Sequence, residues 1–482
     1  QCIGGYARMV TVVNDLRKKR QNPLFLNAGD NFQGTTWYTL LHYNMTASLM
    51  NLNPPDALTI GNHEFDGSPN ELRLFLNAIR APVVVANMDI KNEPSLKGKF
   101  KNSVVLQKQG RKIGIIGVIY DKTNLIANTG NVRFTNSSKA IVTEAKRLKA
   151  QGVDIIIVLS HCGFNVDLEM ARQTEGMVDV IVGAHTHTLL YKGTVPGPDK
   201  AEDTYPVVVE INGHKTLIVQ ALAYGKYVGD LIVKFDAKGE AVSWSGNPIY
   251  VDQSWQRNAT IDKELAYWRK KVETISNKLV TRSKIDWPRR ECRMDQCEIA
   301  LLVADSMVEY WKNRTKSNDI IGFIHGGGIR TELDAGDITF GDLIQVIPYS
   351  STVDYFELKG KDLVAALEHA AVFDEDEGKY NFLQPSGLKY TVDLRKPQGQ
   401  RVTQVQIKSG REFKALKSDQ VYKVTTISYL AGGHDGFAVL RDKRMNHRVG
   451  QLDIDVLVDY VKKFKELPQI SDKRLSVKKL KA

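Results

Sequence analysis

Cysteine and proline are both scarce in this chain, and long apolar runs are absent. The 482 residues include 4 cysteines and 15 prolines, against 37 glycines. So few cysteines exclude a small scaffold held by disulfides, and the proline and glycine contents differ from those of collagen or of disordered chains. No run of about 18 apolar residues occurs, which excludes an ordinary membrane-spanning helix. We expect a folded, soluble protein of two or three domains.

The ends of the chain carry no recognisable targeting segment. QCIGGYARMV lacks the basic start and apolar block of a signal peptide, and SVKKLKA is too polar for a lipid-anchor signal. We expect no membrane anchor, and either a leader that has been removed or further residues upstream of Gln1. Four N-glycosylation sequons, slightly more than chance predicts, lean toward a secreted, extracellular protein; they are Asn44, Asn136, Asn258 and Asn313.

Positive charge is in moderate excess. The 66 Lys and Arg residues exceed the 55 Asp and Glu residues by 11, a balance that suits nucleic acid, an anionic cell surface or an anionic small substrate. The excess is spread along the chain and increases only near its two ends. Such a distribution is typical of an ordinary solvated surface, so we expect no nucleic-acid partner.

The first half repeats one pattern, in which a short β-branched or aliphatic run ends in small or polar residues and a helical stretch follows. The runs are PLFLNAGDNFQGT, DALTIGNHEFD, KIGIIGVIY, VDIIIVLSHCGF and VDVIVGAHTHT. Buried strands of layered α/β domains have this pattern, and their ligands bind beyond the carboxyl ends of the strands. Helices are expected over residues 5–20, 70–79 and 138–151.

The second half has a different pattern. Residues 256–281 are charged and have helical periodicity, which predicts a linker helix. Beyond them, helices are expected over 298–311 and 360–371, with short strands at GLKYTVDL, RVTQVQIK and YKVTTISY. We therefore predict an α/β domain over residues 1–255 and an α+β domain over 282–482.

Potential metal ligands follow four strands of the first half. They are Asp30 in GDNFQGT, Asn62 in GNHEFD, His161 in SHCGF and His185 in GAHTHT. Zinc, manganese and iron sites use this mixture of carboxylate, amide oxygen and imidazole. A single such residue is more often a cap or a buried polar group of the core, but four of them at the same ends of successive strands predict a metal site.

GNHEFD is the most specific of these motifs. Its Asn62 is placed to bind a metal, while His63 is placed to face a substrate. Asp66 follows closely enough to orient His63 and to keep it protonated. A protonated His is the general acid that the leaving group of a phosphate ester needs.

In order and spacing, these four motifs resemble the metallophosphoesterase motifs of the 5'-nucleotidase and apyrase family. HGGGIR, YNFLQPSG and GGHDGF in the second half look like that family's nucleotide-binding domain. The resemblance covers essentially the whole chain and is closest to secreted animal 5'-nucleotidases and soluble salivary apyrases of blood-feeding arthropods. It implies a calcineurin-like metallophosphoesterase domain with four layers, α/β/β/α, followed by an α+β nucleotide-binding domain.

The resemblance also implies roles for residues of the first domain. Asp30 would bridge two divalent ions, and the motifs leave their identity open among zinc, manganese, calcium and magnesium. His63 and Asp66 would form the catalytic dyad. His187 aligns with a family position that carries an amide side chain, so it would either bind the first ion or line the pocket. Three residues would complete the site of the second ion: Asn62, His161 and His185.

For the second domain the resemblance implies a nucleotide-binding pocket. Arg330 of HGGGIR would bind the phosphates, as suits a planar and permanently charged guanidinium. Phe382 and Phe437 would stack on the two faces of the purine, and Asp442 would accept hydrogen bonds from the ribose hydroxyls. His325 stands where the family has an Asn at the start of the loop.

The chain departs from the family at its start and at two cysteines. An Asp-x-His motif that supplies two ligands of the first ion belongs roughly 20 to 30 residues before GGYAR, so we expect that motif, and the first strand of domain 1–255, upstream of Gln1. Cys2 supports this expectation, because the family pairs the matching cysteine with one slightly upstream. Cys292 has lost its usual partner; it is either free or paired with Cys297.

A further departure lies in the phosphate-binding segment. WPRRECRMDQC places Trp287 and Pro288 where the family has a cysteine and a phosphate-binding arginine. Arg289 and Arg290 are the candidates to replace that arginine, although Pro288 restricts the backbone beside them.

These features predict a secreted apyrase that hydrolyses ATP and ADP to AMP and phosphate, preventing ADP-induced platelet aggregation during blood feeding. One alternative is a 5'-nucleotidase that converts AMP to adenosine. A second alternative is a catalytically impaired anti-haemostatic binding protein on the same fold. A third is a phosphodiesterase that acts on sugar nucleotides or on cyclic nucleotides. The expected partners are the nucleotide and, beyond it, a host platelet or another anionic surface.

Overall fold

The computed structural model describes residues 3–33, 35–373, 380–410 and 412–479, so Cys2 lies outside the described residues. The chain divides into two compact units, Gln1–Lys271 and Val272–Ala482. The division falls inside helix α7 (Ala259–Ser276), which Asn258 caps by accepting hydrogen bonds from two backbone N–H groups. Within the described part of the chain, no helix is both long and apolar enough to cross a membrane.

The main sheet of the first unit has the strand order β4-β5-β7-β8-β10-β9. Its central strands β5, β7, β8 and β10 run parallel, and the edge strands β4 and β9 are antiparallel to their neighbours. All seven residues of β7 are buried, as expected for a parallel strand covered on both faces. The strands span Ser103–Lys108 (β4), Arg111–Ile119 (β5), Ile155–His161 (β7), Val180–Gly183 (β8), Val207–Ile211 (β9) and His214–Val219 (β10).

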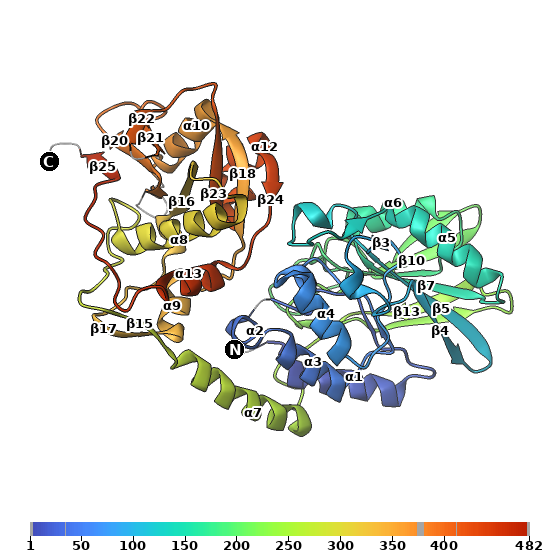
Figure 1. Cartoon of the computed structure of the whole chain (residues 1–482). Coiled ribbons are helices and arrows are strands. Elements are labelled where there is room, and N and C mark those ends of the chain that lie inside the picture. The colour runs from blue at the N-terminus through green and yellow to red at the C-terminus, as the bar shows by residue number, and fades with distance from the viewer. Residues whose placement is uncertain (1–2, 34, 374–379, 411, 480–482) are drawn as a thin grey trace. The chain divides into compact units, whose positions relative to one another are not determined.

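Successive residues of these strands pack on opposite faces of the sheet. Ile116 and Val158 pack against helices α5 (Ser137–Lys149) and α6 (Phe164–Gln173), which lie together on one side of the sheet (Figure 1). Ile115 and other residues of the opposite face pack against further strands. Those strands are β1 (Leu26–Asn27), β2 (Ala57–Leu58), β12 (Leu231–Phe235) and β13 (Ala241–Gly246).

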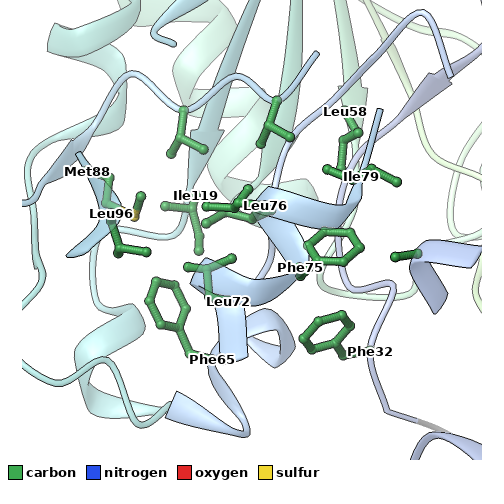
Figure 2. Close-up of a cluster of buried hydrophobic side chains, with 14 of the residues drawn as sticks. Phe32, Leu58, Phe65, Leu72, Phe75, Leu76, Ile79, Met88, Leu96 and Ile119 are labelled. Atoms are coloured by element: carbon green, nitrogen blue, oxygen red, sulfur yellow. The ribbon is translucent and has the colours of Figure 1, made fainter. Parts of the chain in front are cut away.

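A second core lies between β2 and helix α4 (Ser68–Ala78). Leu72, Phe75 and Leu76 lie on one face of α4 and are buried with Phe32 and Phe65, which come from the GDNFQGT and GNHEFD segments (Figure 2). This apolar cluster therefore anchors both segments. The layers run helix, sheet, strands, helix, so the predicted four-layer α/β arrangement is confirmed. The other elements of the unit are α1 (Tyr6–Lys19), α2 (Thr36–Leu41), α3 (Tyr43–Leu52), β3 (Met88–Asp89), β6 (Arg133–Phe134), β11 (Tyr227–Val228) and β14 (Ile249–Tyr250).

The second unit contains a five-stranded sheet, β19-β16-β23-β18-β24, and a four-stranded sheet, β22-β21-β20-β25. Helix α8 (Glu298–Thr315) packs on the first sheet through an almost continuous set of buried residues. The remaining helices are α9 (Phe340–Val346), α10 (Gly360–Ala370), α11 (Ser428–Ala431), α12 (Ala438–Lys443) and α13 (Asp453–Val461). The strands are β15 (Leu279–Ser283), β16 (Ile320–His325), β17 (Gly336–Thr339), β18 (Val353–Lys359), β19 (Leu383–Ser386), β20 (Leu388–Asp393), β21 (Val402–Ser409), β22 (Glu412–Ala415), β23 (Val421–Ile427), β24 (Met445–Arg448) and β25 (Leu475–Lys478).

The strands expected at the first two motifs are shorter than their apolar runs. Strand β1 ends at Asn27, whose side chain accepts a hydrogen bond from Gly29 N at 2.9 Å. Gly29 and Asp30 then adopt φ values of 91° and 55°, so the chain turns away from the sheet and presents Asp30 beyond the strand end. The helices expected over 5–20, 70–79 and 138–151 are confirmed to within two residues as α1, α4 and α5.

Candidate active site

Three predicted ligands converge at the carboxyl ends of the strands of the first unit. Asp30 follows β1, His161 is the last residue of β7, and His185 follows β8. Their ligand atoms all lie within 4.8 Å of one another. His185 has a φ of 77°, a conformation that non-glycine residues seldom adopt and that marks sites where the backbone is held for a purpose.

The contact between His161 and Asp30 has the geometry of two ligands rather than of a hydrogen bond. His161 Nε2 lies 2.9 Å from Asp30 Oδ2, yet it has no hydrogen-bond partner. His161 Nδ1 is 2.7 Å from the carbonyl oxygen of Ala28, so Nδ1 carries a proton and Nε2 is the ring nitrogen that faces Asp30. Metal-binding histidines are commonly held in this way.

Asn62 gives a second sign of a metal site. Its side-chain oxygen Oδ1 is buried and lacks a hydrogen-bond partner, which is costly for a polar atom without a ligand. Gly61 beside it leaves the room that the site needs, because a Cβ atom there would overlap Asp30 Oδ1 and lie 2.6 Å from His161 Nε2. A carboxylate, an amide oxygen and imidazoles therefore fit a divalent ion of the zinc or manganese type.

Electrostatics favours the metal-binding forms of Asp30 and His185, whereas at His161 burial is outweighed by the charge of Asp30, which raises the pKa of the imidazole. Burial opposes the charge on Asp30, but His161 and His63 outweigh this effect and lower the pKa of its carboxyl group below the usual range. Burial and the nearby His161 lower the pKa of His185 to about 4. At neutral pH Asp30 is thus an anion and His185 is a neutral imidazole.

His63 and Asp66 form the predicted pair next to these ligands. His63 Nδ1 lies 2.8 Å from Asp66 Oδ2; the imidazole is 39% exposed, whereas the carboxylate is 6% exposed. Burial favours neutral His63, but the charge and hydrogen bond of Asp66 overcome this and raise the pKa of His63 to about 10. The backbone N–H of His63 also donates to Asp30 Oδ1 at 3.0 Å, which couples the pair to the ligand cluster.

Glu64 is a residue of the site that our sequence analysis missed. Its fully buried carboxylate accepts backbone N–H groups from two loops, at 2.5 Å from Gly61 and at 2.9 and 2.5 Å from Asp30 and Asn31, and a fourth from Phe32 at 3.2 Å. It thereby joins the loop that carries Asp30 to the loop that carries Asn62. In the sequence, only its position between His63 and Asp66 in GNHEFD indicated that Glu64 could belong to the site.

His187 lies outside the three-residue cluster. It is exposed and contacts the ring of Tyr224 edge-on, with the centroids 5.5 Å apart, whereas His185 stacks on Tyr120 at 5.4 Å. Burial lowers the pKa of His187, so its imidazole is neutral at neutral pH. Its role, as a ligand of the first ion or as a residue that lines the pocket, stays a prediction.

Removal of His185 tests the ligand cluster. We expect His185→Ala to weaken metal binding by more than about 10-fold, because even the loss of an outer partner of a ligand typically costs that much. His187→Ala should retain the parent's metal content, measured by atomic emission after dialysis. Equal loss of metal from both variants would make His187 a ligand, and no loss from His185→Ala would contradict the cluster.

The second unit brings Arg330 and His325 to one glycine-rich loop. Strand β16 ends at His325, and exposed Arg330 donates from Nη1 to the carbonyl oxygen of Gly327 at 3.3 Å. His325 stacks on Tyr429 with the centroids 5.9 Å apart, and its Nδ1 lies 3.9 Å from Asp435 Oδ2. Burial, followed by the charges of nearby arginines, lowers the pKa of His325.

The residues predicted to hold the base and ribose already have protein partners. Phe382 stacks on Tyr380 at 5.1 Å and Phe437 contacts His369 edge-on at 4.6 Å, and the two phenylalanines are 0% and 1% exposed. Exposed Asp442 pairs with Arg441 at 2.7 Å. The structure thus places these side chains without presenting an open aromatic face, and their role in nucleotide binding stays a prediction.

The segment that departs from the family is closed by a disulfide between Cys292 and Cys297. Arg289 Nε donates to the carbonyl oxygen of Ile329 at 3.0 Å, and the exposed side chain of Arg290 lies 4.0 Å from Glu291. Cys162 is a buried free thiol.

Comparisons with known proteins agree with this arrangement. Residues 2–189 match the calcineurin-like phosphoesterase family, and residues 272–442 match the 5'-nucleotidase C-terminal domain. An apyrase of Anopheles gambiae is 43% identical over 96% of this chain and 83% of its own length. A 5'-nucleotidase of Mus musculus is 35% identical over 96% of this chain and 83% of its own length.

Solved structures that align with nearly the whole chain are also similar. The 5'-nucleotidase precursor from Thermus thermophilus is 35% identical, with a TM-score of 0.62 over 98% of this chain and 94% of that chain. The NAD nucleotidase of Haemophilus influenzae has a TM-score of 0.77 at 24% identity over 98% and 93% of the two chains, which shows a common fold.

Proposed function

The chain belongs to the 5'-nucleotidase and apyrase family of dimetal-dependent nucleotide phosphohydrolases, and we propose that it is a secreted apyrase that hydrolyses ATP and ADP to AMP and phosphate. The observation that carries this proposal is the cluster of Asp30, His161 and His185 next to the His63–Asp66 pair. The apyrases of Anopheles gambiae, Tabanus yao and Aedes aegypti are 41–43% identical to this chain, against 34–35% for mammalian 5'-nucleotidases, and this difference favours the apyrase activity.

The residues of the site have different roles in this proposal. Asp30, Asn62, His161 and His185 would hold the ions, which when bound supply Lewis acidity toward the phosphoryl group and lower the pKa of water. His63, kept protonated by Asp66, donates its proton from Nε2 to the leaving-group oxygen as the phosphorus–oxygen bond breaks. Glu64 keeps the two ligand-bearing loops in register.

The second unit would bind the nucleotide. The guanidinium of Arg330 suits bidentate contacts with phosphate oxygens, and Phe382, Phe437 and Asp442 are the residues proposed for the base and ribose. The four sequons support secretion. A secreted apyrase that removes ADP would prevent ADP-induced platelet aggregation, and we propose this role during blood feeding.

Phosphate release from ATP, ADP and AMP by the purified protein tests the proposal. We expect phosphate from ATP and ADP, with AMP accumulating as the product, in the presence of divalent ions. Release from AMP alone would replace the apyrase with a 5'-nucleotidase. Inhibition of ADP-induced aggregation in platelet-rich plasma tests the physiological role, and a catalytically inactive variant separates hydrolysis from simple nucleotide binding.

A further inference from the structure

Two arginines from different segments approach the same glycine of the loop after β16. Arg330 donates to the carbonyl oxygen of Gly327. A Cβ atom placed on Gly327 would lie 3.1 Å from Arg293 Nη2 and 2.9 Å from His325 Nδ1. The missing side chain of Gly327 therefore leaves a small space with guanidinium and imidazole nitrogens around it.

The segment that carries Arg293 is held firmly in this position. The fully buried side chain of Gln384 donates to the carbonyl oxygens of Cys292 and Asp295 at 2.8 and 2.7 Å, and accepts from Cys297 N at 3.0 Å. The disulfide closes the same turn. Three hydrogen bonds to one side chain and a covalent link thus fix the turn against strand β19.

The backbone of Arg293 also contacts both parts of the predicted nucleotide pocket. Its carbonyl oxygen accepts a hydrogen bond from Phe382 N at 3.3 Å. A Cβ atom on Gly326 would lie 2.7 Å from Arg293 N, so the loop passes directly over this residue. Arg293 consequently lies between the loop that carries Arg330 and the segment that carries Phe382.

Neither arginine expected from the sequence is placed in this way. Arg289 donates to the backbone of the loop at Ile329 and so supports it from outside, and Arg290 is directed to solvent with its side chain 90% exposed. Both precede the disulfide-closed turn, and Pro288 comes before them. Arg293, inside the turn, has its guanidinium next to Gly327 at the start of the loop, whereas Arg289 contacts the loop at Ile329.

We propose that Arg293 binds the phosphates of the nucleotide together with Arg330, and that it replaces the arginine that the family carries at the position of Pro288. This inference rests on the proposed function. Two guanidinium groups next to Gly327 match the several acceptor oxygens of a phosphate chain.

Substitution of Arg293 in the full chain tests the proposal. We expect Arg293→Met to raise the KM for ADP about 10- to 100-fold, the range set by the loss of a charge-assisted hydrogen bond, with a smaller change in kcat. The Kd of a non-hydrolysable ADP analogue, measured by calorimetry, should rise by the same factor. Arg293→Lys keeps the charge without the planar fork and should restore part of the affinity.

Arg290→Met is the matched control, because it removes the same charge from the same segment at an exposed position. It should leave KM, kcat and the analogue's Kd unchanged. Equal effects of both variants would show that net charge rather than position matters, and unchanged affinity in Arg293→Met would also overturn the proposal. If Arg293→Met fails to fold, as judged by its melting temperature, Arg293→Lys and Arg293→Gln decide the question. A parent protein that hydrolyses neither ATP nor ADP would instead refute the proposed function.

Discussion

Replacing His63 with glutamine should lower kcat for ADP by about 10²- to 10⁴-fold, the usual contribution of a positioned general acid. Glutamine has a similar length and stays polar, but it has no proton to give to the leaving oxygen. The metal content should remain that of the parent, because His63 contacts Asp30 only through its backbone N–H. Steady-state kinetics on ADP, with metal analysis of the same sample, measures both quantities.

The leaving group offers a sharper test of the same role. A phosphate ester of a simple alcohol expels an alkoxide that must be protonated, whereas p-nitrophenyl phosphate expels a stable anion, so His63→Gln should impair hydrolysis of the alcohol's ester far more than that of p-nitrophenyl phosphate. His214→Gln is the control: this histidine begins strand β10, at the opposite end of the parallel strands from the site, and pairs with Glu240 at 2.8 Å. Equal impairment on both substrates would contradict general acid catalysis by His63.

Asp66 should control the pH range in which His63 is active. Because Asp66 raises the pKa of His63, the acid form persists to higher pH in the parent, and activity falls only as the pH rises through that pKa. Asp66→Asn removes the charge and lowers the pKa, so the alkaline limb of kcat/KM should move to lower pH. A limb that does not move would assign the proton donor to another group.

Local sequence patterns predicted the fold and the convergence of Asp30, His161 and His185, for a physical reason. An apolar run such as Ile155–His161 determines a buried strand by itself, and a motif at its end places its side chain at the sheet edge. Asp30, His161 and His185 were therefore predictable one strand at a time. The strand runs overestimated β1 and β2, and Asn27 and Gly29 end β1 early.

Features that depend on two distant segments were not predictable in the same way. Arg293 rather than Arg289 faces Gly327 because Gln384, from β19, fixes how the turn after Cys292 is placed. The burial of Phe382 beneath Tyr380 likewise depends on packing. No spacing within the motifs carries this information.

Glu64 combines both situations, since its motif is recognisable but three of its four N–H partners lie more than thirty residues away along the chain. A carboxylate can accept all four of the N–H groups that converge on it from Gly61 and from residues 30–32. A glutamine amide presents one oxygen and one NH₂ group, and the NH₂ group would face backbone donors. Each buried donor left without an acceptor costs about 1–3 kcal/mol.

Glu64→Gln leaves two buried N–H donors without an acceptor, so it should lower the free energy of unfolding by about 2–6 kcal/mol. It should also disrupt metal binding. The second effect follows because two of the donors belong to Asp30 and to Gly61, directly before Asn62, so both ligand loops lose their common anchor. Urea denaturation of the parent and the variant gives the first quantity, and metal analysis gives the second.

Glu144→Gln is the matched control, because Glu144 is also a buried acid of the first unit. Its partners are the side chains of Ser103 and Arg147, at 2.5 and 2.6 Å, and side chains can reorient toward an amide whereas backbone N–H groups cannot. The control should lose less stability and retain its metal. A Glu64→Gln protein with the parent's metal content and rate would show that Phe32, Phe65 and the apolar cluster beneath the loops are sufficient to hold the site.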